Sequence, residues 1–68
     1  MIAPELEEYF RLRLEWKLEV DPDIKAGLRR QLDDMAGNLC GQRNLPFSAR
    51  EFFEAMRQPF NQWARRAR

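Results

Sequence analysis

Side chains that could act as nucleophiles are few in this 68-residue chain, which contains one cysteine, Cys40, one serine, Ser48, and no threonine or histidine. A serine or cysteine nucleophile is normally activated by a histidine base, which this chain lacks. A closed zinc site needs about four nitrogen or sulfur ligands, and haem or iron–sulfur ligation needs histidine or several cysteines. The composition therefore predicts a protein that is not an enzyme and that holds no metal or other cofactor.

The remaining reactive side chains have structural explanations. Ser48 and Glu51 have the S-x-x-E spacing of a capping box, so we expect Ser48 to begin a helix. Cys40 is expected to pack as a small apolar group beside Leu39, the last residue of an apolar stripe. Asp33 and Asp34 are adjacent and would not face each other on a helix, so we expect a solvated surface rather than a catalytic pair.

Length and composition predict one domain, residues 1–68. Two tryptophans, one tyrosine and five phenylalanines argue against disorder. No apolar run approaches the roughly 18 residues of a transmembrane segment, and residues 1–5 do not resemble the start of a signal peptide. Together with the single cysteine, these features predict a cytoplasmic protein.

Charge is distributed unevenly along the chain. Residues 1–38 contain nine acidic and six basic side chains, whereas residues 39–68 contain two acidic and six basic ones. Such asymmetry suits head-to-tail self-association, or docking of the basic end on an acidic surface. A basic last turn also complements the dipole of a terminal helix, which is the simpler interpretation.

Apolar spacing and capping residues predict a small all-α domain of three helices, at residues 4–20, 22–40 and 48–67. In the middle helix Asp21 can cap, Pro22 fits the first position, and Gly41 is a natural stop. In the last helix Pro59 lies within the apolar pattern. It has no amide to donate and crowds the carbonyl of Ala55, so we expect a kink at Pro59.

Residues 4–20 present two conflicting patterns. Helix-forming residues dominate, but from residue 10 to residue 20 apolar and charged side chains alternate strictly, which is typical of a half-buried strand. A helix would place Arg13 and Lys17 within a broad apolar arc and would need partners on more than one side. A strand would find no partner strand in the chain. We expect a helix, with a strand at 10–20 as the alternative, and both interpretations favour an oligomer.

The surplus apolar surface and the aromatic last helix predict a non-catalytic interaction module. Such a helical bundle would serve as a regulator, adaptor or assembly subunit by binding a partner protein or a second copy of itself. Tryptophan and arginine are enriched among the residues that dominate binding energy. The expected anchors are Trp16, Phe60, Trp63, Arg65 and Arg66, although ordinary core packing is the simpler interpretation for each aromatic residue.

The alternative order of strand, proline-containing turn, helix, glycine-containing loop and helix, from Phe10 to about Phe60, resembles the ribbon-helix-helix family of DNA-binding transcriptional regulators. This resemblance implies a dimer that pairs its strands and inserts their outward side chains into the DNA major groove. The corresponding residues are Arg11, Arg13, Glu15 and Lys17. A further interpretation is contact of residues 62–68 with nucleic acid or a membrane surface, since tryptophan beside arginine suits both.

Overall fold

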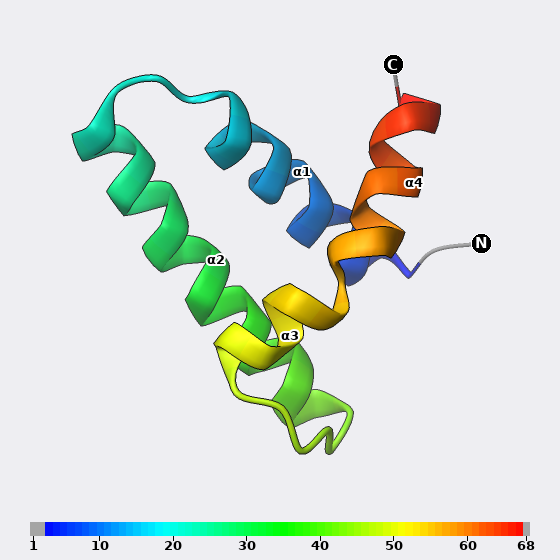
Figure 1. Cartoon of the computed structure of the whole chain (residues 1–68). Coiled ribbons are helices and arrows are strands. Elements are labelled where there is room, and N and C mark those ends of the chain that lie inside the picture. Colours follow the sequence, from blue (N-terminus) through cyan, green and yellow to red (C-terminus); the bar gives the residue numbers. More distant parts are fainter. Residues whose placement is uncertain (1–2, 68) are drawn as a thin grey trace.

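The computed structural model describes residues 3–67, and this part of the chain contains four helices and no strand (Figure 1). The helices are α1 (Pro4–Leu18), α2 (Pro22–Gln42), α3 (Ala49–Ala55) and α4 (Arg57–Ala67). The predicted small all-α fold is confirmed, with four helices rather than three. The alternative with a strand at 10–20 is wrong, because residues 10–18 belong to α1.

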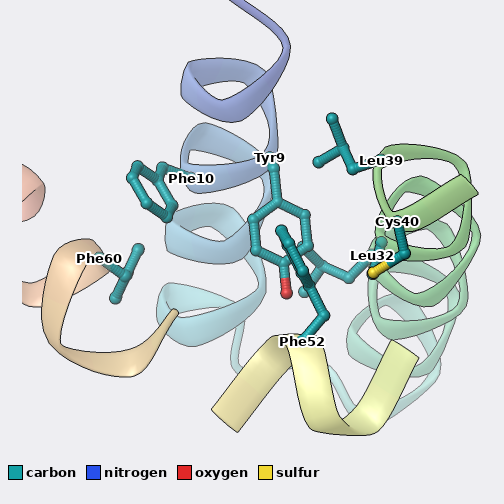
Figure 2. Packing of buried hydrophobic residues seen from close by; sticks show 8 residues of the cluster. Tyr9, Phe10, Leu32, Leu39, Cys40, Phe52 and Phe60 are labelled. Atoms are coloured by element: carbon teal, nitrogen blue, oxygen red, sulfur yellow. The ribbon is translucent and has the colours of Figure 1, made fainter. Parts of the chain in front are cut away.

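α1 is apolar around most of its circumference because it has neighbours on two sides. It packs against α2 on one side and against α4 on the other (Figure 1). Successive helical residues point about 100° apart, so Tyr9 points toward α2 and α3 while Phe10 faces Phe60 of α4 (Figure 2). The alternating pattern thus reflects a central helix whose partners lie in the same chain.

The core lies between these helices and is rich in aromatic rings. The Tyr9 and Phe52 ring centroids are 5.1 Å apart in an edge-on arrangement, and those of Phe10 and Phe60 are 5.9 Å apart. The buried apolar side chains are Tyr9, Phe10, Leu32, Ala36, Leu39, Cys40, Phe52 and Phe60. Within residues 3–67, no helix combines the length and apolar character needed to cross a bilayer.

α2 ends in a Schellman motif two residues later than predicted, at Gln42. The helix continues through Gly41, and Asn44 adopts the left-handed conformation with a φ of 53°. The amide of Leu45 donates to the carbonyl of Cys40 at 2.9 Å, and that of Asn44 donates to Gly41 at 3.4 Å. The expected stop at Gly41 is wrong, because asparagine tolerates the left-handed region well enough to end the helix instead.

The predicted kink at Pro59 is replaced by a break at Met56, between α3 and α4. The amide of Met56 donates to the carbonyl of Phe52, and its own carbonyl accepts the first bond of the next helix, from Phe60. Pro59 then lies in the first turn of α4, where amides need no intrahelical acceptor. Interrupting the helix upstream therefore removes both the missing hydrogen bond to Ala55 and the steric conflict.

α3 begins with the predicted capping box at Ser48. The Ser48 hydroxyl accepts a hydrogen bond from the amide of Glu51, and the Glu51 carboxylate accepts one from the amide of Ser48. These hydrogen bonds from Ser48 hold the pKa of Glu51 below its ordinary value. Ser48 therefore has a structural role in starting the helix.

Candidate functional site

A groove of about 370 Å³ opens where the C-terminal half of α1 meets α3 and α4. Its wall contains three basic side chains and one acidic one, together with three aromatic rings. We call it the basic groove, and its lining residues are Arg13, Trp16, Lys17, Phe53, Glu54, Arg57, Phe60 and Asn61. It is the place where charged side chains of the first helix meet the aromatic residues of the last two.

Arg13 lines the basic groove and is only 6% exposed. Its guanidinium donates a hydrogen bond of 2.8 Å to the carbonyl of Phe53. The guanidinium carbon also lies 3.7 Å from the ring centroid of Phe53 and 4.8 Å from that of Phe60. Burial lowers the pKa of Arg13, although an arginine remains protonated at any physiological pH.

Two cations from α2 complete a stack of charges and rings beside the groove. Arg29 lies 4.0 Å from the Phe53 centroid, and Lys25 lies 4.8 Å from the Trp16 ring. The rings of Trp16 and Phe53 meet edge to face at 5.6 Å. Each cation–π contact contributes about 0.5–1 kcal/mol when exposed and up to about 2 kcal/mol when desolvated. The stack therefore fixes the orientation of Trp16 and Phe53 at the groove wall.

The cations of the basic groove have no carboxylate within the 4.0 Å limit for an ion pair, as far as residues 3–67 are concerned. The ion pairs found in that range are Glu7–Arg11 and Arg29–Asp33. Arg13 donates its hydrogen bond to the neutral carbonyl of Phe53. The groove thus concentrates positive charge beside aromatic surface.

A second hollow of about 270 Å³ adjoins the basic groove and shares Lys17 and Asn61 with it. It extends the positive surface along α4 as far as Arg65. Arg57, Asn61 and Arg65 recur every four residues, so they follow one face of α4. The two hollows together make a basic strip along the line where α1 and α4 meet.

The interaction residues predicted from the sequence are divided between two faces. Trp16 and Phe60 line the basic groove, and Arg65 lies on its extension. Phe60 is only 2% exposed, so its ring belongs to the core and contributes little surface to the groove. Trp63 and Arg66 instead line a different groove of about 420 Å³, together with Glu7 and Arg11.

The DNA-reading arrangement implied by the ribbon-helix-helix resemblance is not formed. Arg11 is exposed and paired with Glu7 at 2.9 Å. Arg13 is buried, and Lys17 lies in the basic groove. The three side chains would share one face of a strand, but on a helix Arg11 is about 200° from Arg13, at about 100° per residue. The grouping of these residues on one outward face is therefore wrong.

Phe53 and Arg57, which line the groove, and Arg29, which lies beside it, were not predicted from the sequence as parts of this site. A repeated spacing could have indicated them, because basic residues lie four apart at Arg13 and Lys17 and again at Lys25 and Arg29. Residues four apart share a helix face. The pattern marks a basic face on each helix, but it does not show that these faces converge on Phe53.

Tyr9 places a hydroxyl group in the apolar core, and replacing this residue tests what the hydroxyl contributes to stability. Its side chain is fully buried, and its hydroxyl has no hydrogen-bond partner within residues 3–67. Burial raises the pKa of this hydroxyl, partly offset by the nearby charge of Arg13. Because an unsatisfied buried polar group is unfavourable, we expect Tyr9→Phe to leave stability unchanged or to raise it by about 1 kcal/mol.

Urea unfolding followed by circular dichroism would measure this effect. Tyr9→Leu is a suitable control, because it removes the ring as well as the hydroxyl and should be clearly destabilising. A loss of stability in Tyr9→Phe comparable to that in Tyr9→Leu would show that the hydroxyl makes a favourable bond.

No protein-family model, curated protein or solved structure matches this chain. Within residues 3–67, no group of three or more histidine, cysteine, aspartate or glutamate side chains is placed to hold a metal ion. The function is therefore inferred from the geometry of the basic groove.

Proposed function

We propose that this protein is a non-catalytic interaction module that binds a segment of a partner protein in the basic groove. The observation that carries the proposal is the open groove of about 370 Å³ in which aromatic rings lie beside cations without carboxylate partners. The module would act as a regulator, adaptor or assembly subunit. Its single buried cysteine suits the reducing cytoplasm, where we place it.

The groove suits a segment that combines acidic with apolar side chains. Arg13, Lys17 and Arg57 outnumber the one acidic residue of the wall, Glu54, so a carboxylate entering the groove gains charge-assisted hydrogen bonds. Arg13 is already desolvated and held in place, so little conformational entropy is lost when it pairs. Apolar side chains of the same segment would cover the half-buried ring of Trp16.

The side chains of the groove wall suit binding better than catalysis. The charged side chains of the groove wall are two arginines, one lysine and one exposed glutamate, and its lining residues include no serine or cysteine. Preorganised aromatic and guanidinium groups are typical anchors of protein interfaces. The arrangement therefore favours recognition of a partner segment.

Selection of short random peptides displayed on phage, with the intact protein as bait, would test the proposal. We expect the selected peptides to combine aspartate or glutamate with aliphatic or aromatic residues. Binding should weaken at least about tenfold in the double variant Lys17→Glu with Arg57→Glu, because like charges then meet at the groove. Both positions are exposed, so the fold should be retained.

Arg30→Glu is the matched control. Arg30 is exposed on α2 and lines none of the hollows described above, and its reversal changes the net charge in the same direction. Peptide affinity should be unchanged in this variant. Failure to select any peptide, or equal binding by the groove variant, would refute the proposal.

A further inference from the structure

The turn between α1 and α2 exposes an unusual amount of apolar surface. Leu18 is 61% exposed, Val20 92% and Ile24 53%, and all three lie within seven consecutive residues. We call residues 18–24 the elbow. Figure 1 shows it at the far end of the α1–α2 pair, away from α3. Isolated exposed aliphatic residues are common, but three in one turn form a patch that suits burial against a partner.

The elbow is also acidic. It contains Glu19, Asp21 and Asp23 and no basic residue. The turn is rigid, because the Glu19 carboxylate accepts hydrogen bonds from the amides of Val20 and Asp21, and the Asp21 carboxylate caps α2. Three carboxylates and three aliphatic side chains are therefore presented in a fixed arrangement. This combination of acidic and apolar side chains is the one that suits the basic groove.

We infer that the occupant of the basic groove is the elbow of a second copy of this chain, so that two copies form a reversible dimer. The inference rests on the proposed role of the groove as a binding site and names its partner. The main support for this dimer is charge complementarity. The elbow has only acidic charges, whereas the groove wall has three basic side chains and one acidic one. The dimer would also cover the aliphatic side chains that the monomer leaves exposed.

The positions of the two surfaces allow a closed dimer. The elbow begins at Leu18, directly after Trp16 and Lys17 of the groove wall. Elbow and groove therefore lie at the same end of α1, and a two-fold axis can place each elbow in the other copy's groove. Such an isologous contact closes on itself and does not extend into a filament. Because the elbow is short, we expect a small interface and weak, concentration-dependent association.

Sedimentation velocity of the full chain over a range of concentrations would test the inference. We expect an equilibrium between the 8.2 kDa monomer and a species of twice that mass. Val20→Ser should weaken the association at least about fivefold while leaving the unfolding curve unchanged, because Val20 is 92% exposed in the monomer. Arg30→Glu, on the exposed surface of α2, should have no effect on the association.

A charge exchange identifies the two surfaces as each other's partners. Asp23→Lys alone, or Arg57→Glu alone, should give monomers, because like charges meet in both halves of the dimer. Mixing the two single variants should restore dimers, since every contact then pairs a lysine with a glutamate or Asp23 with Arg57. The double variant Asp23→Lys with Arg57→Glu should dimerise by itself for the same reason.

Two results would overturn the inference. A protein that stays monomeric at every concentration would show that the elbow does not occupy the groove. A dimer whose association is unaffected by the charge-exchange variants would show the same. If the elbow does not occupy the groove but the selected peptides still need Lys17 and Arg57 for binding, the proposed function is retained. The occupant of the groove is then a different partner. Failure of the peptide selection together with intact elbow–groove dimers would refute the proposed binding of a partner protein and leave the groove as a site of self-association.

Discussion

Replacing Phe10 by alanine is expected to lower the free energy of unfolding by about 4 kcal/mol. Phe10 is fully buried, and its ring lies 5.9 Å from that of Phe60 and 5.7 Å from that of Trp63. It forms most of the aromatic contact between α1 and α4. A 68-residue domain has a total stability of roughly 3–10 kcal/mol, so this one substitution should leave a large fraction of the molecules unfolded at 37 °C.

Far-ultraviolet circular dichroism during thermal and urea unfolding would measure the change. Phe47→Ala is the control, because Phe47 is 40% exposed and lies outside the buried cluster, so its loss should be less than about 1 kcal/mol. Similar losses in the two variants would mean that the contact between α1 and α4 contributes little to folding.

Replacing Arg13 by alanine is expected to cost about 3 kcal/mol, although arginine is usually a surface residue. The substitution removes the hydrogen bond to the Phe53 carbonyl and leaves that acceptor without its partner. It also removes the guanidinium from the rings of Phe53 and Phe60 and opens a void beside them. The loss should be seen in urea unfolding at neutral pH.

Two further variants separate the contributions at this position. Arg13→Lys keeps the charge but not the planar group that stacks on Phe53, so we expect it to lose about 2 kcal/mol. Arg11→Ala, which breaks only the exposed pair with Glu7, should change stability by less than about 0.5 kcal/mol. An Arg13→Lys protein as stable as the parent would show that a point charge suffices and that stacking is unimportant.

The sequence predicted those features of the fold that depend on neighbouring residues. The caps at Asp21 and Ser48 were predicted correctly because each acts on amides within three residues. The prediction for Pro59 identified a disturbance but not its position. A proline can be accommodated by a kink or by a new helix that begins just before it, and the choice depends on how α3 and α4 pack.

The site was less predictable because it depends on contacts between distant parts of the chain. Trp16 lines the basic groove, and its predicted role as a binding anchor stays a prediction, whereas Arg13 meets its hydrogen-bond acceptor 40 residues away, at Phe53. No pattern among neighbouring residues of the sequence predicts such a contact. The strict alternation after Phe10 was similarly misleading, since a helix enclosed on two sides needs apolar side chains around most of its circumference.

Because Cys40 is buried, the rate at which its thiol is labelled measures how often the protein opens. The thiol is only 4% exposed and is packed among the core residues of α2 and α3 (Figure 2). Reagents that modify thiols reach it only in molecules whose helices have separated, so the labelling rate measures the population of opened molecules. Because Cys40 is the only thiol, this rate can be followed without denaturant and in any mixture that lacks other reactive cysteines.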